Sequence, residues 1–199
     1  YLASLEENES IFLGMPLLND PEADVKKVAD ELNKLYKDEA AKGAVAFMGH
    51  GNPDTYDTFK ANVRYTQLEE ALQAINKNYF VGTVDMPDNY KQEVHGRMVA
   101  SGITSGNIYL HALMSIAGDH AHNDMVGEGE EYWGNEETED DSWFEYFNNN
   151  NYNPIVTLGA NKEPLGLLEL PGILNVWIEH TKNAEFLEEA YHTMGIPED

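Results

Sequence analysis

Short apolar runs alternate with amphipathic helical stretches along most of this chain, and this alternation limits the folds open to it. A short apolar run can be buried on both faces, as strands of a parallel sheet are, while an amphipathic stretch can cover one face of that sheet. The sequence therefore predicts an α/β fold, a parallel four-stranded sheet flanked by helices and followed by a helical C-terminal tail. The predicted strands are residues 10–18, 44–48, 79–85 and 107–116, with a short further strand over 154–158. The predicted helices cover about residues 21–41, 56–75, 89–101 and 170–194.

Length and composition predict one compact domain, because 199 residues with 42% hydrophobic side chains can bury one substantial core. No apolar run approaches the roughly 20 residues that span a bilayer, so we expect a soluble chain without a membrane span. We expect it in the cytoplasm, or in a periplasmic or other extracytoplasmic compartment if a signal segment preceding Tyr1 was removed. The absence of cysteine excludes disulfides and thiolate metal sites and leaves His, Asp and Glu as the strong metal ligands.

The charge balance restricts the possible partners. With 36 acidic and 12 basic residues, the net charge of −24 repels nucleic acid and anionic membranes, so we expect no nucleic-acid partner. Much of the acidic charge lies in an insertion over about residues 127–141. This segment reads either as a solvated surface loop or as a region that raises the local concentration of divalent cations.

Side chains that can bind a metal follow three of the predicted strands. His50 follows the strand over 44–48, Asp85 ends the strand over 79–85, and His120 follows the strand over 107–116. Neighbouring parallel strands lie about 4.8 Å apart and end at the same edge, so these side chains can converge on one ion about 2.1 Å from each. Two imidazoles and a carboxylate suit Zn²⁺, Co²⁺, Ni²⁺ or Fe²⁺ better than Mg²⁺ or Ca²⁺. Alternatively, the histidines are satisfied polar residues that cap strand ends.

The residues around these candidates receive supporting or structural roles. Glycines on both sides of His50 allow a close approach of the backbone. Asp119 and Asp124 are interpreted as groups that support the ligands or cap strand ends, and His122 is left outside the metal site. The other histidines are assigned to structure, namely His95, His111, His180 and His192.

Four motifs, in order, resemble the anaerobic sirohydrochlorin cobalt chelatase family of the CbiK type. They are Phe47–Gly51, Gly82–Asp85, Leu113–Met125 and Asp141–Trp143. The resemblance implies a class II chelatase, in which two similar α/β lobes clasp a tetrapyrrole, and the chain is similar to the C-terminal lobe. It further implies that the opposite wall of the substrate cleft comes from a missing N-terminal lobe or from a second chain, for example in a homo-oligomer.

The same resemblance implies a function and a site. By motif match, His50 and His120 are the metal-binding and catalytic histidines, and Asp85 stands where the family has a glutamate ligand. The implied reaction inserts Co²⁺, with Fe²⁺ or Ni²⁺ as other possible metals, into sirohydrochlorin during anaerobic cobalamin biosynthesis. A neutral imidazole can hold the ion and can accept a proton that the ring must lose. The alternative is a non-catalytic protein that binds a metal or a tetrapyrrole and passes it on.

Overall fold

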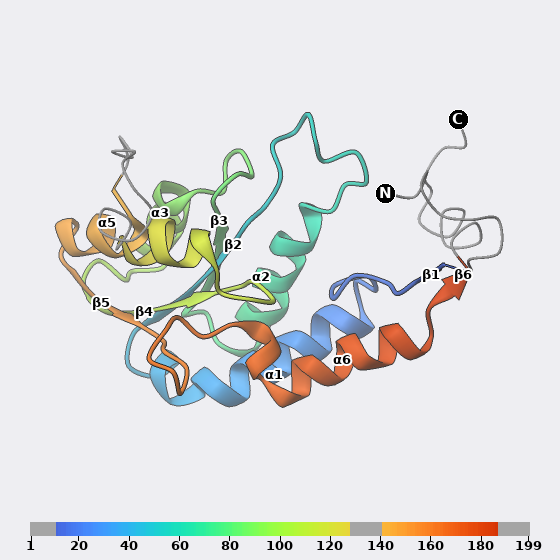
Figure 1. Cartoon of the computed structure of the whole chain (residues 1–199). Helices are drawn as coiled ribbons and strands as arrows, with labels where there is room; N and C mark the ends of the chain where they lie inside the picture. The colour runs from blue at the N-terminus through green and yellow to red at the C-terminus, as the bar shows by residue number, and fades with distance from the viewer. Residues whose placement is uncertain (1–10, 128–140, 187–199) are drawn as a thin grey trace.

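The structure, a computed structural model that describes residues 11–127 and 141–186, contains a four-stranded parallel sheet with helices on both faces (Figure 1). The strand order is β3-β2-β4-β5, and every neighbouring pair is parallel. This confirms the predicted fold class. The strands of this sheet are β2 (Ala44–Gly49), β3 (Tyr79–Thr83), β4 (Gly106–Ala112) and β5 (Tyr152–Val156). The helical elements are α1 (Ala23–Ala40), α2 (Val63–Ile75), α3 (Lys91–Ala100), α5 (Trp143–Asn149), α6 (Pro171–Lys182), the π-helical turn η2 (Ala121–Val126) and the 3-10 turn η3 (Leu167–Glu169).

The central strand β2 is buried along its whole length because helices cover both faces of the sheet. Its side chains alternate between the two layers, as the pleat of a strand requires. Val45 and Phe47 join the core under α1, α2 and α6, whereas Ala46 and Met48 join the core under α3 and α5. The end of β2 is therefore held from both sides. No helix in the described ranges has the length and apolar character that a membrane crossing needs.

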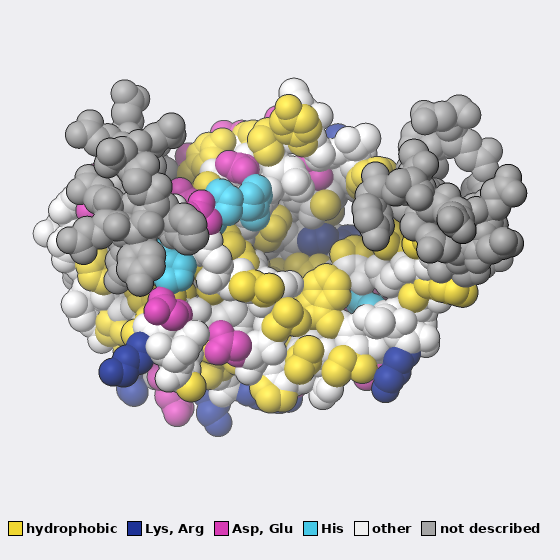
Figure 2. All heavy atoms as spheres, in the orientation of Figure 1, with side chains coloured by type: hydrophobic (Ala, Val, Ile, Leu, Met, Phe, Trp, Pro, Cys, Tyr) yellow, Lys and Arg dark blue, Asp and Glu magenta, His cyan; other side chains and the backbone are white. Residues whose placement is uncertain are grey.

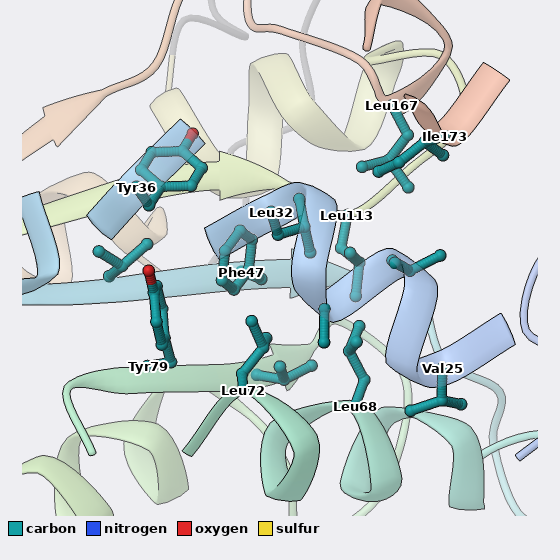
Figure 3. Close-up of a cluster of buried hydrophobic side chains, with 14 of the residues drawn as sticks. Val25, Leu32, Tyr36, Phe47, Leu68, Leu72, Tyr79, Leu113, Leu167 and Ile173 are labelled. Atoms are coloured by element: carbon teal, nitrogen blue, oxygen red, sulfur yellow. The ribbon is translucent and has the colours of Figure 1, made fainter. Parts of the chain in front are cut away.

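The first of these two cores is built on the apolar stripe of α1 (Figure 3). Val25, Leu32 and Tyr36 recur at helical spacing and are buried against the sheet. Helices α2 and α6 and strands β2 and β3 complete this layer. Their contributions include Leu68, Leu72, Ile173, Phe47 and Tyr79.

The edge strand β3 has side-chain partners along its outer side. Gln73 donates to the carbonyl oxygen of Tyr79 at 2.9 Å, and the amide of Val81 donates to the carboxylate of Glu69 at 2.6 Å. The guanidinium of Arg97 donates to the carbonyl oxygen of Val81 at 2.8 Å and forms an ion pair with Glu69 at 2.9 Å. Residues from α2 and α3 thus occupy positions that a neighbouring strand would take.

The predicted strand over residues 10–18 is wrong. Only β1 (Phe12–Leu13) is extended, and it pairs antiparallel with β6 (Glu185–Phe186) in a separate two-stranded sheet. The segment follows the end of α6 instead of entering the main sheet. A Cβ atom on Gly14 would lie 3.1 Å from the carbonyl oxygen of His180, and the imidazole of His180 lies 3.1 Å from the carbonyl oxygen of Met15. The fourth strand of the parallel sheet is β5.

Other predicted boundaries also differ from the structure. The helix predicted from residue 56 begins at Val63, because the carboxylate of Asp57 accepts from the amide of Ala61 at 2.7 Å and Lys60 has a left-handed φ of 56°. Strand β4 ends at Ala112 instead of residue 116. The C-terminal helical region ends at Lys182, and its predicted continuation beyond residue 186 lies outside the described residues. Of the acidic insertion over 127–141, the described residues include only the two ends, 127 and 141.

Candidate metal centre

The sheet brings the three predicted metal ligands to one edge, because β2 lies between β3 and β4. The amide of Asp85 donates to the carbonyl oxygen of His50 at 2.8 Å, which continues the β2–β3 pairing beyond the strand ends. On the other side, the amide of Leu113 donates to the carbonyl oxygen of Met48 at 2.8 Å, so the β2–β4 pairing also continues one residue beyond the end of β4. His120 then immediately precedes η2, eight residues after the end of β4.

The side chains of these residues contact one another. The rings of His50 and His120 meet edge to face, with centroids 4.5 Å apart and an interplanar angle of 90°. Nδ1 of His50 lies 3.5 Å from Oδ2 of Asp85. All three side chains are partly exposed to solvent. Figure 2 shows adjoining histidine side chains at the surface, with acidic and hydrophobic side chains around them.

Both histidines use the same ring nitrogen for a hydrogen bond. Nδ1 of His50 lies 2.7 Å from the carbonyl oxygen of Gly51, and Nδ1 of His120 lies 2.6 Å from Oδ2 of Asp124. A carbonyl or carboxylate oxygen can only accept, so each Nδ1 carries the hydrogen. In the neutral ring, Nε2 then keeps its lone pair. Histidines that bind metals in proteins usually have this arrangement, with the second nitrogen donating to a carbonyl or carboxylate.

The partner of His120 is supplied by the π-helical turn η2. Ala121 and Met125 of this turn are fully buried in the second core, which fixes the backbone that carries Asp124. π-helical turns occur frequently at functional sites. Asp119, the other carboxylate of this motif, accepts a hydrogen bond from the side chain of Asn123 at 2.9 Å.

The turn after His50 depends on glycine and on a tyrosine from α2. Gly51 has a φ of +74°, and a Cβ atom there would lie 2.8 Å from the amide nitrogen of Met86. The hydroxyl of Tyr65 accepts a hydrogen bond from the amide of Gly51 at 3.2 Å. Burial raises the pKa of Tyr65, so the hydroxyl stays protonated. Sequence reasoning missed Tyr65, because a tyrosine on a helix gives no signal of its contact with a strand end.

The donor set is open. Within residues 11–127 and 141–186, no three His, Asp or Glu side chains lie close enough together to hold a metal ion. His50 instead contacts Asp85 on one side and His120 on another. A groove of about 510 Å³ between α1 and α2 is lined by residues that include Gln67 but not His50, Asp85 or His120. The histidine site therefore differs from the groove in bringing together side chains that can donate to a metal.

The other described histidines lie apart from this site. His122 is 3.7 Å from the carboxylate of Glu163, and His95 packs against Tyr146. His111 is fully buried within β4, and His180 joins α6 to the segment that follows β1. His192 lies beyond the last residue that the structure describes.

The fold and the site together define an α/β protein whose sheet presents an open set of imidazole and carboxylate donors at its carboxyl end. A comparison with models of known protein families matches residues 4–185 to the cobalt chelatase (CbiK) family. This match covers most of the chain, so the chain belongs to the cobalt chelatase (CbiK) family, as the sequence motifs indicated. Membership implies a metal chelatase whose substrates are a divalent metal ion, cobalt in the family description, and a tetrapyrrole.

Proposed function

We propose that this chain inserts Co²⁺ into sirohydrochlorin in the anaerobic route to cobalamin. His50 and His120 bind the metal and act in catalysis, and Asp85 is the third metal donor. The observation that carries this proposal is the pair of adjoining imidazoles whose Nδ1 atoms are both engaged, which leaves both Nε2 atoms available to a metal.

The reaction needs a site that binds the ion and then releases it. A tetrapyrrole must lose two pyrrole protons while a partly dehydrated ion enters its centre, so metal ligands and a proton acceptor must lie close together. His50 and His120 can perform both tasks as the ion passes to the ring. The carboxylate of Asp85 has no hydrogen bond within the described part of the chain, so it can rotate between rotamers toward the ion. An open donor set suits an ion that is handed on.

Exposed apolar side chains near the histidines support a flat macrocycle as the second substrate. Tyr56 and Phe59 lie in the segment after His50, and their exposed fractions are 76% and 57%. Ile116, which precedes His120, is 75% exposed. Apolar surface of this kind commonly marks a binding site. The opposite wall of the substrate cleft comes, in this proposal, from an N-terminal lobe or from a second chain.

The test follows the absorbance spectrum of sirohydrochlorin mixed with Co²⁺ under anaerobic conditions. The chain is compared with its His50→Ala and His120→Ala variants and with a reaction without protein. His122→Ala serves as the matched control, because this histidine is near in sequence but contacts Glu163 instead of the site. We expect faster metallation with the chain and with the control, and a loss of at least about tenfold in each site variant.

Other outcomes would change the proposal. Equal rates for the chain and both site variants would exclude His50 and His120 as the working residues. If no rate increase is seen, but Co²⁺ or sirohydrochlorin binds and the site variants lose that binding, the chain is a carrier of metal or tetrapyrrole. Acceleration that appears only when a second lobe is joined to the chain would show that the opposite wall is required for turnover.

A further inference from the structure

The two arginines of the chain have very different surroundings. Arg97 lies at the edge of the sheet, where Glu69 neutralises its charge and the carbonyl oxygen of Val81 accepts from its guanidinium. Arg64, in the first turn of α2, forms no ion pair within the described residues. Arg64 is thus a cation without a carboxylate partner in the described part of a chain with three times as many acidic as basic residues.

The guanidinium of Arg64 is nevertheless held in place. Nη1 donates to the side-chain oxygen of Gln67 at 2.7 Å, and Nη2 donates to the carbonyl oxygen of Asn19 at 2.9 Å. Both acceptors are neutral, so they orient the group without cancelling its charge. A guanidinium has five N–H donors, and the remaining ones are available to a ligand.

Asp20, a carboxylate that the charge of Arg64 affects, accepts hydrogen bonds from backbone amides. Oδ1 of Asp20 accepts from the amides of Glu22 and Ala23 at 2.8 and 2.7 Å, at the start of α1. These two amides are the main reason that the pKa of Asp20 is lowered, and the charge of Arg64 lowers it less than they do. Asp20 therefore lies within electrostatic reach of Arg64 but does not form an ion pair with it.

Arg64 belongs to the same end of the molecule as the histidines. The next residue, Tyr65, accepts a hydrogen bond from the amide of Gly51, which directly follows His50. The loop between them is tied at its base, because the side chain of Asn62 both accepts from the amide of Asn52 at 2.9 Å and donates to its carbonyl oxygen at 2.7 Å. The Cα atom of Arg64 lies about 3.8 Å from that of Tyr65, as for any two neighbouring residues, and the side chain of Tyr65 contacts the turn after His50.

A second unpaired cation lies in that loop. Lys60 is exposed and forms no ion pair within the parts of the chain described. Other lysines, among them Lys42 and Lys91, also form no ion pair there, so what matters is the position of Lys60 and not its lack of a partner. Arg64 and Lys60 thus place positive charge in the segment that follows His50, where it would attract an anionic substrate that the strongly acidic protein otherwise repels.

We propose that Arg64 binds a carboxylate at the periphery of the tetrapyrrole and thereby positions the macrocycle over His50 and His120. This inference rests on the proposed function, since it assumes a tetrapyrrole at this face. A guanidinium can grip a carboxylate through two parallel N–H groups, which fixes orientation as well as affinity. Arg64 is a substrate-positioning residue in this scheme and takes no part in binding the metal.

The experiment measures tetrapyrrole binding by the full chain without added metal. Fluorescence titrations use uroporphyrin, which carries carboxylates on both kinds of side arm, and coproporphyrin, which carries half as many. The variants are Arg64→Gln and Arg64→Lys. Lys42→Gln is the charge-matched control, because Lys42 precedes β2 and so lies at the opposite end of the sheet. Each titration is repeated at two salt concentrations.

We expect Arg64→Gln to raise the Kd for uroporphyrin about 10- to 100-fold relative to the chain. The preference for uroporphyrin over coproporphyrin and the salt dependence of binding should fall with it, and Arg64→Lys should restore part of both. A merely structural role in holding Asn19 would not change the ligand preference. Equal Kd values for Arg64→Gln and Lys42→Gln would overturn the inference, as would a chain that binds neither porphyrin. Failure of the proposed function is separate, because it appears as unchanged Co²⁺ insertion in the His50 and His120 variants.

Discussion

Histidines occupy two contrasting regions of the same sheet. His111, in the middle of β4, is fully buried, and its Nδ1 lies 2.6 Å from the hydroxyl of Tyr36. Its Nε2 makes no hydrogen bond of ordinary geometry within the described residues, although the backbone of Leu165 is near enough to favour the protonated ring slightly. His50 and His120, at the carboxyl end, are partly exposed and leave Nε2 free for a ligand. Position along a parallel sheet thus decides whether an imidazole is buried in the core or is accessible to a ligand.

The largest effect should come from the buried region. Burial lowers the pKa of His111 from its ordinary value of 6.5 to about 4. The folded chain therefore keeps this ring neutral between these two pH values, whereas the unfolded chain protonates it. The contribution to stability is complete above pH 6.5 and is lost as the pH falls toward 4, by about 3 kcal/mol in total.

Urea unfolding between pH 7.5 and pH 4 measures this effect against a His111→Gln variant, whose amide does not titrate. The difference in unfolding free energy between the chain and the variant should change by about 3 kcal/mol as the pH falls over this range. His122→Gln is the control, because His122 is partly exposed, and should keep the pH dependence of the chain. Parallel curves for all three proteins would show that His111 is not kept neutral by burial.

An intermediate effect is expected at the partner of His120. Asp124→Ala removes the acceptor that fixes the hydrogen on Nδ1, so the ring can turn and the lone pair on Nε2 is no longer assured. We expect the Kd for Co²⁺ to rise about 10- to 100-fold while the fold is retained. Titration calorimetry with Co²⁺ measures it. Asp119→Ala is the matched control, since Asp119 bonds to Asn123. The same Kd for both alanine variants would contradict a specific role for Asp124.

The smallest effect is expected at the support of the His50 turn. Tyr65→Phe removes the hydroxyl that accepts from the amide of Gly51 and should lower the free energy of unfolding by about 1 kcal/mol. Thermal unfolding checks this value against Tyr56→Phe, which alters an exposed side chain. A loss of stability in Tyr56→Phe as large as that in Tyr65→Phe would show that the hydroxyl at Gly51 is not what matters.

The sequence was sufficient to predict the layers of the fold and the meeting of the three strand ends. The apolar runs of β2 and β3 are buried on both faces, so their burial is visible in the residue types alone. The run over residues 10–18 was misleading, because an apolar segment that packs on α6 has the same composition as a strand. Helix α5 was overlooked, although Ser142 and Glu145 form a capping box that signals its start.

The details of the candidate site were less accessible. The sequence predicts a supporting role for Asp124, and the structure shows its carboxylate in contact with His120. The sequence does not predict the contact of His50 with the carbonyl oxygen of Gly51, because every residue has a backbone carbonyl and the residue type gives no signal of its partner. The hydrogen bonds that hold Arg64 depend on how α2 meets the segment before α1, which is a matter of tertiary packing.

The side chains bonded to the outer edge of β3 affect how the protein can associate with other strands. The outward groups of Tyr79 and Val81 already have partners in Gln73, Glu69 and Arg97. A foreign strand that tried to add here would have to separate a partly buried ion pair and leave its members unmatched before gaining its first backbone contact. Growth of the sheet into fibrils or edge-to-edge dimers is therefore disfavoured on this side, so the chain can keep apolar side chains exposed around its histidines without offering this edge as a template for aggregation.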